Sequence, residues 1–431
     1  MKKFRIILLA LFILSMLTTM LGCGGSPTSG GVDKLEDSTI NGEEAKNLTF
    51  IRPGQNADDE KDPVVKAIRE YEKLYGVKVE IMAADYDTWT TKVLSASTAG
   101  TPIDVIFGGV SEYPLFAMKG YTQPIGKFVN LDSKYVSRSA SEAFFSFKND
   151  IYVASVANVS PLVLYYNRDM IESEGLTDPL ELYNKGEWTF DTFREMCKAL
   201  TSDTDGDGNV DRWGLCSWYS WVWLGANHTA LCNITDEGLY ELNLGSPAVV
   251  QTLEFVQDMY YTSKWRGLDG DNIFTSFYQG RNAFLNEYSW VETSHIIPAK
   301  DSGQFDFEYG LVPMPYGPNN TEKYNVAHAS GYGIGTGSAN PYHAGKLIDM
   351  ILKSVTDDGA EKDKKVQQEH LSLYKSLSAK IYNDSYYDSA IKNGSDLFAL
   401  VCGGSNIQTS ISSIKPVFEG FIDDANEAAK G

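Results

Sequence analysis

Cysteine and histidine are few in this sequence, and their spacing matches no familiar metal-binding motif. The chain has 5 cysteines and 5 histidines among 431 residues. No C-x-x-C or H-E-x-x-H pattern occurs, so neither a structural zinc site nor a zinc protease is indicated. The G-x-S-x-G elbow and the G-x-x-x-x-G-K-[ST] phosphate loop are also missing. The sequence therefore gives no sign of these enzyme classes.

Positive charge is scarce as well. Lys and Arg total 37 against 57 Asp and Glu, which gives a formal net charge of −20. Because nucleic acids are bound by clustered Lys and Arg, this balance argues against a nucleic-acid partner. The hydrophobic content of 43% is that of a soluble globular protein, and the length predicts at least two domains.

A long hydrophobic run occurs at the N-terminus, where it predicts an export signal. A basic start precedes the apolar run from Ile6 to Leu17, which is short for a membrane span. The following letters MLGC resemble a bacterial lipobox, so we expect residues 1–23 to be a lipoprotein signal peptide with a lipidated Cys23. Residues 24–46 are rich in Gly, Ser, Asp and Glu, as in a flexible tether. We therefore expect an extracytoplasmic protein held at the cell membrane by its lipid alone.

Strand and helix patterns alternate through the rest of the chain. The stretch LTFIRPG predicts a strand, and Asp62 with Pro63 predicts the start of a helix that Gly76 ends. The stretches VKVEIM and IDVIFGG predict further strands, and the same alternation restarts near residues 151–166. This order is typical of a mostly parallel α/β sheet repeated in two units.

Five segments, taken in order, resemble the extracellular solute-binding proteins of bacterial ABC importers, in the sugar-binding family that includes the maltose-binding protein. They are LYYNRDMIESEGL, GEWTFDTFREMCKALT, FYQGRNAFLNEYSW, GLVPMPYGP and GYGIGTGSANPYHAGKLIDMIL. The resemblance implies an α/β, two-lobe periplasmic-binding-protein-like fold of type II with a multi-strand hinge. The first lobe would comprise residues 47–154 plus 313–355, and the second lobe residues 155–312 plus 356–431.

The same resemblance implies a function. We expect a monomer that binds a carbohydrate, in particular an oligosaccharide, between its lobes and passes it to the permease subunits of an ABC importer. It would be no enzyme, and it would need no cofactor. Three alternatives stay open from the sequence: a non-sugar solute such as a peptide or polyamine, a secreted glycan hydrolase, and a surface adhesin.

Candidate ligand-binding residues are mostly aromatic, because indole and phenol rings stack on the C–H faces of sugars. In the second lobe the stretch SWYSWVWLGA follows a predicted strand, and Trp290 lies in a matching family segment. Its candidates are Trp218, Tyr219, Trp221 and Trp290. The first lobe adds two candidate rings, those of Trp89 and Tyr332. It also adds two carboxylates, those of Asp104 and Glu112, which could accept hydrogen bonds from sugar hydroxyls. For each of these residues, packing in the core is the competing interpretation.

The stretch SDTDGDGNVDRWG resembles a calcium-binding EF-hand loop. Gly214 stands where such a loop has its bidentate Glu, and a helix and a strand are predicted to flank it instead of two helices. A calcium sensor is therefore not expected. A structural calcium ion or a metal-free Asp-Gly turn remain as the two interpretations. The candidate metal ligands are Asp203, Asp205, Asp207, Asn209 and Asp211. Cys216 and Cys232 could form a disulfide or remain buried thiols.

Overall fold

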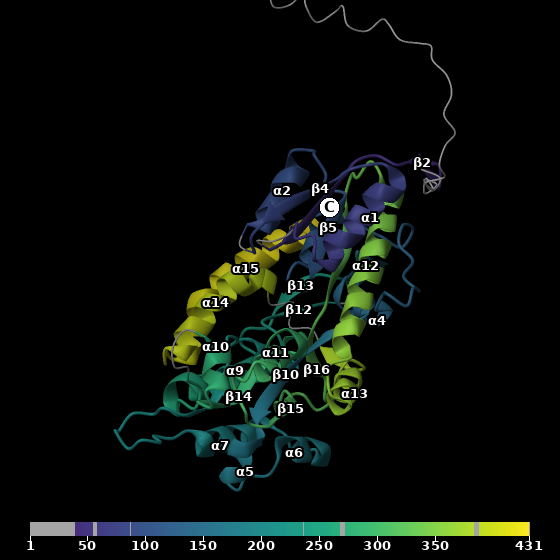
Figure 1. Cartoon of the computed structure of the whole chain (residues 1–431). Helices are drawn as coiled ribbons and strands as arrows, with labels where there is room; N and C mark the ends of the chain where they lie inside the picture. The colour runs from purple at the N-terminus through teal and green to yellow at the C-terminus, as the bar shows by residue number, and fades with distance from the viewer. Residues whose placement is uncertain are drawn as a thin grey trace, which may run out of the picture.

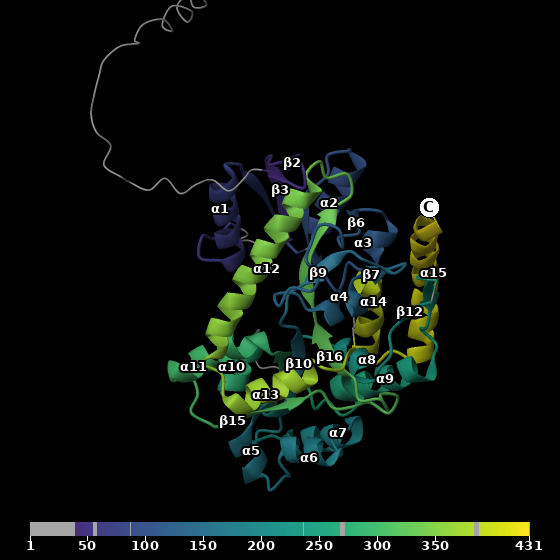
Figure 2. The ribbon, with the colours of Figure 1, turned by 90° about the vertical axis from the view of Figure 1, so that its right-hand side faces the viewer.

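The computed structural model describes residues 39–54, 58–86, 88–235, 237–267, 272–382 and 388–430. The expected signal peptide, Cys23 and most of the expected tether lie outside the described residues. Two sheets with helices packed around them form two lobes, one above the other in Figures 1 and 2. The predicted α/β two-lobe architecture is therefore confirmed.

The first lobe is built on a six-stranded sheet. Its strands, in spatial order, are β4 (Val79–Ala84), β3 (Leu48–Pro53), β5 (Val105–Gly109), β17 (Ser330–Gly335) and β6 (Thr122–Gln123), with β9 (Val153–Ser155) also paired to β17. Strands β3, β4 and β5 are parallel, and β17 runs antiparallel to β5. Its helices are α1 (Pro63–Tyr75), α2 (Trp89–Thr98), α3 (Leu115–Met118) and α4 (Arg138–Phe144), and the hairpin β7 (Ser146–Phe147) with β8 (Asp150–Ile151) belongs to it.

Helix α1 shows why the local sequence signals were reliable. Asp62 accepts a hydrogen bond from the backbone N–H of Val64, Pro63 occupies the first turn, and Gly76 ends the helix with a φ of 67°. These are the N-cap and left-handed C-cap that the sequence predicts. The buried stripe that includes Ile68 and Tyr71 packs in the core of the first lobe.

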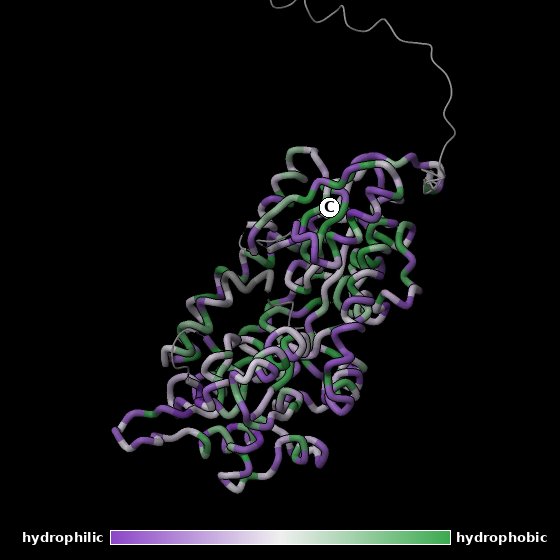
Figure 3. Tube along the Cα trace, in the orientation of Figure 1, coloured by the Kyte–Doolittle hydropathy of each residue, from purple (hydrophilic) through white to green (hydrophobic). Residues whose placement is uncertain are grey.

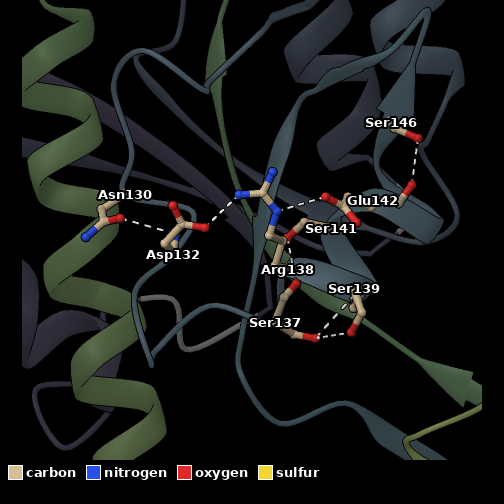
Figure 4. A network of polar contacts seen from close by, with 9 residues as sticks. Asn130, Asp132, Ser137, Arg138, Ser139, Ser141, Glu142 and Ser146 are labelled. Atoms are coloured by element: carbon tan, nitrogen blue, oxygen red, sulfur yellow. Dashed lines mark hydrogen bonds and ion pairs between the residues drawn. The ribbon is translucent and has the colours of Figure 1, made fainter.

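Helix α4 carries a polar network on the surface of the first lobe (Figure 4). Ser137 caps the helix by accepting from the N–H of Ala140, and Arg138 forms ion pairs with Asp132 at 2.6 Å and Glu142 at 2.8 Å. All three charged groups are largely exposed, so solvent screens these pairs and they contribute little to stability. The network orders the surface and indicates no ligand site.

The second lobe is built on another six-stranded sheet. Its strands are β11 (Trp213–Cys216), β14 (Asn282–Tyr288), β10 (Ser160–Asn167), β16 (Asn325–His328) and β18 (Ile381–Tyr382), with β15 (Tyr309–Pro313) also paired to β10. A separate hairpin joins β12 (Cys232–Ile234) and β13 (Tyr240–Leu242). The helices are α5 (Arg168–Ser173), α6 (Pro179–Lys185), α7 (Phe190–Leu200), α8 (Val222–Ala226), α9 (Pro247–Gln257), the π-helical η1 (Asp258–Thr262), α10 (Ile273–Tyr278), the π-helical η2 (Glu292–Ile296), α11 (Ile297–Asp301), α13 (Gln368–Leu377), α14 (Asp388–Cys402) and α15 (Ile407–Lys430).

Several segments cross between the lobes. The chain passes from β9 in the first sheet to β10 in the second, and it returns from β16 in the second sheet to β17 in the first. Helix α12 (Pro341–Asp363) then runs from the first lobe down to the second (Figure 1). The exact lobe boundaries stay a prediction. The predicted boundaries assign β16 to the first lobe, whereas β16 hydrogen-bonds to β10 in the sheet of the second lobe.

The hairpin of β1 (Thr39–Ile40) and β2 (Glu43–Glu44) is fastened to the outer end of the first lobe. The Glu43 carboxylate accepts hydrogen bonds from the N–H groups of Tyr342 and His343 in the first turn of α12. The His343 ring contacts the Glu43 carbonyl oxygen at 3.1 Å and the Tyr71 hydroxyl at 2.9 Å. Residues 39–44, which belong to the expected tether of residues 24–46, are thus fixed to α12 and α1.

Candidate functional site

The aromatic segment after β11 divides into exposed and buried rings. Trp218 is 46% exposed, and Tyr219 and Trp221 are half-buried. Trp223, in α8, is fully buried and stacks on Phe193 at 5.6 Å. The sequence could not divide these rings, because four aromatics within six residues fit either a core or a cleft. In the structure Trp223 packs in the core, whereas the rings of Trp218, Tyr219 and Trp221 remain accessible to a ligand.

The segment is held at its base by a polar contact to the next strand. Ser217 is fully buried, donates to Asn286 at 3.1 Å and accepts from the N–H of Tyr219 at 3.0 Å. Strand β11 runs parallel to β14, with Cys216 opposite Leu285. Trp218 and Trp290 therefore both follow strand ends at the same edge of the second sheet, where ligands of open α/β sheets bind.

Trp290 is 49% exposed and lies above a buried hydrogen-bond network. Two residues later, Glu292 is fully buried and contacts Tyr309 at 2.9 Å, Tyr374 at 2.5 Å and the His370 ring at 2.6 Å. Tyr165 donates to the carbonyl oxygens at positions 288 and 289. Buried, fully bonded networks of this kind hold a backbone in one conformation. The Trp290 indole is thus presented on a rigid base.

Glu287 belongs to the same neighbourhood, and sequence reasoning missed it. Its side chain is only 3% exposed, and its carboxylate accepts from the Tyr219 hydroxyl at 3.3 and 3.4 Å. Burial raises the pKa of Glu287 to about 7. A carboxyl directly beside the aromatic residues Tyr288 and Trp290 was the signal that could have found it.

Tyr288 and His328 extend this aromatic group toward the crossing segments. The Tyr288 ring lies 5.8 Å from that of Tyr219 and 5.7 Å from that of His328. His328 ends β16, next to the crossing into the first sheet. Burial lowers the pKa of His328 to about 4, so its imidazole is neutral at pH 7.

Three of the first-lobe candidates have packing or structural roles in this structure. Trp89 is 3% exposed and packs against Phe107 and Phe116 at 5.8 Å. Tyr332 is 5% exposed and contacts Phe50 and Phe107. The faces of both rings are therefore covered by other side chains.

Asp104 is also occupied. It accepts from the N–H and hydroxyl of Thr49 at 2.8 and 3.0 Å and from Ser338 at 2.6 Å. These three hydrogen bonds come from protein donors, so the Asp104 carboxylate has a structural role: it connects β3 to the segment after β17. The position of Asp104 at a strand edge did not reveal this, because Thr49 and Ser338 are far away in the sequence.

Glu112 is the first-lobe candidate that keeps free bonding capacity. It follows the carboxyl end of β5, and its Oε2 is buried without a hydrogen-bond partner among the described residues. Burial raises the pKa of Glu112 to about 7. Gly109 at the end of β5 pairs with Ser330 at the start of β17, so this turn lies close to the crossing segments.

The acidic loop between α7 and β11 projects from the second lobe as a hydrophilic extension (Figure 3). The carboxylates of Asp203, Asp205 and Asp211 each place an oxygen within 4.8 Å of the others. Asp203 accepts from the N–H groups of Gly206 and Gly208, which lowers its pKa. An all-oxygen donor set of this kind suits calcium, and Asp207 is not one of these three carboxylates.

The four cysteines at positions 197, 216, 232 and 402 are free thiols. Cys216 is fully buried, with its sulfur 3.4 Å from the carbonyl oxygen of Phe284. Of the two interpretations left open by the sequence, the structure therefore favours thiols over a Cys216–Cys232 disulfide. Among the helices of the described residues, none combines the length and the apolar character that a membrane span requires.

Comparison with known proteins places these features in context. The family model described as "Bacterial extracellular solute-binding protein" matches residues 57–355. No curated protein matches the chain. Among solved structures, the ABC substrate-binding protein Lmo0181 from Listeria monocytogenes, in complex with cycloalternan, has 16% identity and a TM-score of 0.64, covering 87% of this chain and 100% of its own.

Two further structures show the same likeness. The GacH receptor of Streptomyces glaucescens, described unliganded and with acarbose, has 15% identity and a TM-score of 0.66, covering 89% of this chain and 100% of its own. The maltose/maltodextrin-binding domain MalE from Bdellovibrio bacteriovorus, bound to maltotriose, has 17% identity and a TM-score of 0.62, covering 89% of this chain and 98% of its own. At these identities the likeness establishes the fold.

Proposed function

The chain belongs to the family of bacterial extracellular solute-binding proteins, and on this basis we propose that it binds an oligosaccharide between its lobes for delivery to an ABC importer. The observation that carries the proposal is the pair of exposed indoles, Trp218 and Trp290, at one edge of the second sheet. Each indole follows the end of a strand and offers an accessible face on which a sugar ring can stack. The ligands named for the three similar structures are cycloalternan, acarbose and maltotriose.

The side chains near these indoles suit a sugar. The two rings would stack on the C–H faces of successive pyranoses, and the half-buried Tyr219 and Trp221 would line the space beside them. Glu287 and, from the opposite lobe, Glu112 would exchange hydrogen bonds with sugar hydroxyls. A carboxyl with a pKa of about 7 can either donate or accept such a bond at neutral pH.

Lobe closure would follow from the same contacts. A ligand bound to both lobes makes more contacts when they are closed than when they are open, so it shifts the population toward the closed form. The crossings β9–β10 and β16–β17 are the segments that would absorb the rotation. The closed form would then be the one that the permease subunits recognise.

A second candidate ligand is a polyamine, and one observation favours it. Glu112 and Glu287 are both deeply placed, and neither forms an ion pair with a Lys or Arg among the described residues. A cationic ligand would neutralise both carboxylates, and aromatic rings also attract cations. As a member of a family of binding proteins, the chain is assigned no catalytic residue under either proposal.

Three further assignments complete the proposal. We propose that Cys23 carries the lipid that holds the protein at the extracytoplasmic face of the cell membrane. We propose that the protein works as a monomer. We also propose that Asp203, Asp205 and Asp211 bind a calcium ion that stabilises the loop leading into β11.

The experiment is a ligand screen with the mature chain. Binding would be followed by tryptophan fluorescence and by thermal shift against linear and cyclic oligosaccharides, with putrescine and spermidine as the cationic arm. Saturable quenching by an oligosaccharide supports the proposal. Saturable binding of spermidine with no response to any sugar would replace it with the polyamine function.

A further inference from the structure

A row of partly exposed rings runs from the segment after β11 to the crossing between the lobes. The rings are those of Trp221, Tyr219, Tyr288 and His328, with centroids 5.5, 5.8 and 5.7 Å apart in that order. The site proposed above uses the two rings at the β11 end of this row and assigns no role to the histidine at the other end. His328 is therefore the candidate for a further contact to the ligand.

The strand register explains why the row ends at the crossing. Tyr288 ends β14 opposite Leu162 of β10, and His328 ends β16 opposite Ser160, the first residue of β10. Residues opposite one another in an antiparallel pair share a face of the sheet, and so do residues two apart on one strand. The Tyr288 and His328 rings therefore meet across β10 on one face, at the end of the second sheet where both crossing segments enter it (Figure 2).

The imidazole of His328 has unused bonding capacity. Its two nitrogens form no hydrogen bond with any residue that the structure describes, and neither nitrogen is closed off from solvent. Burial lowers the pKa of His328 to about 4, so at pH 7 one nitrogen is a donor and the other is an acceptor. A partly buried polar ring without partners gains from a ligand that fills both roles.

The Tyr288 and His328 rings form a corner, because their planes are inclined at 64° to one another. A pyranose in such a corner can place a C–H face on one ring and its hydroxyls against the other. Hydroxyl groups donate and accept hydrogen bonds, as the two nitrogens of a neutral imidazole do together. An ammonium group only donates and a carboxylate only accepts, so either would leave one nitrogen of the ring unpaired.

We propose that His328 is a specificity-determining residue of the interlobe site, where it hydrogen-bonds hydroxyl groups of a neutral sugar unit held against Tyr288. This inference rests on the proposed function and narrows it, because it assigns the end of the site at the crossing to an uncharged, hydroxylated ligand. The ligand would then contact β16 directly beside a segment that rotates when the lobes close.

The test compares His328→Phe and His328→Gln with the parent mature chain. Phenylalanine keeps a ring against Tyr288 but removes both nitrogens, whereas glutamine keeps a donor and an acceptor. Isothermal titration with maltotriose, mannotriose and spermidine gives the Kd of each chain. We expect His328→Phe to weaken the binding of a trisaccharide about tenfold, since a ligand hydroxyl loses its partner in a partly buried place. His328→Gln should keep part of this affinity.

The matched control is His228→Phe, at a half-buried histidine that stacks on Tyr324 at 4.4 Å and lies outside the row. It should bind the trisaccharide as the parent does. Melting temperatures without ligand show whether each variant is folded, and His328→Leu, which also lacks both nitrogens, replaces His328→Phe if that variant is not.

The outcomes separate this inference from the proposed function. Equal trisaccharide binding by the parent and by His328→Phe would overturn the role of His328 alone, and equal losses in His328→Phe and His328→Gln would overturn the hydrogen bond. A parent chain that binds spermidine and neither trisaccharide would contradict the sugar function itself, and this inference with it.

Discussion

Replacing Trp290 by alanine separates a ligand platform from a core residue. Trp290 is 49% exposed in this structure, so about half of the 150–250 Å² that a tryptophan can bury, roughly 100 Å², remains for a ligand to cover. At about 25 cal/mol per Å², that area corresponds to ~2.5 kcal/mol. A sugar covers one face of the ring, so we expect a loss of about 1–2.5 kcal/mol in binding free energy, or roughly 5- to 60-fold in Kd.

The stability of the same variant should change little. The backbone around Trp290 is held by Glu292 and Tyr165, neither of which bonds to the indole. Trp223→Ala is the matched contrast, because that ring is fully buried and its removal should cost about 3–5 kcal/mol of unfolding free energy. Tyr261→Ala, at an exposed aromatic on η1, controls for loss of surface area.

The assay pairs isothermal titration with urea unfolding on each variant. The reasoning is refuted if Trp290→Ala unfolds as easily as Trp223→Ala, or if it binds the identified ligand as tightly as the parent. The first result would make Trp290 a packing residue, the second would remove it from the ligand site, and both would leave Trp218 as the exposed indole of the site.

Three other predictions follow from the structure. Calcium should raise the melting temperature of the mature chain, because an ion that binds only the native loop stabilises the folded state by mass action. Asp205→Ala should remove this shift. Identical melting temperatures in calcium and in chelator would contradict the prediction. Burial raises the pKa of Glu287 from 4.5 to about 7. Between pH 4.5 and pH 7 the folded chain therefore binds more protons than the unfolded chain does. The free energy of unfolding should consequently fall as the pH rises from 4.5 to 7. Glu287→Gln should flatten this slope in urea titrations, and parallel slopes would show that the carboxyl is not responsible. Cys23→Ser should move the protein from the membrane fraction to the soluble fraction or block its processing; full retention on membranes would argue against the lipid.

The sequence predicted the fold well where local signals and tertiary packing agree. Helix α1 begins at a capped proline and ends at a left-handed glycine, and β3, β4 and β5 follow the predicted strand patterns. The path of α15 was not predictable, because its contacts are distant in sequence: Asp424 pairs with Lys119 of the first lobe, and Asn426 bonds to the backbone of Tyr240.

The candidate site was only partly predictable, for a related reason. A sequence shows that Trp89, Trp223 and Trp290 lie near element ends, but burial depends on what the other elements bring against each ring. Trp89 is covered by Phe107 and Phe116, which come from a different strand and helix. Glu287 was missed because its segment was interpreted only through Trp290, and the Tyr219 hydroxyl that contacts its carboxylate is far away in the sequence.

The attachment of the β1–β2 hairpin has a mechanical consequence. With Cys23 fixed in a membrane, tension along the tether would enter the molecule at Glu43 and pass into the first turn of α12 and, through His343, into α1. The load would enter at the outer end of the first lobe, but α12 continues from there down to the second lobe and would carry part of it along its length. Tension on the anchor would therefore reach both lobes, and the opening and closing of the tethered protein would depend on the force along the tether.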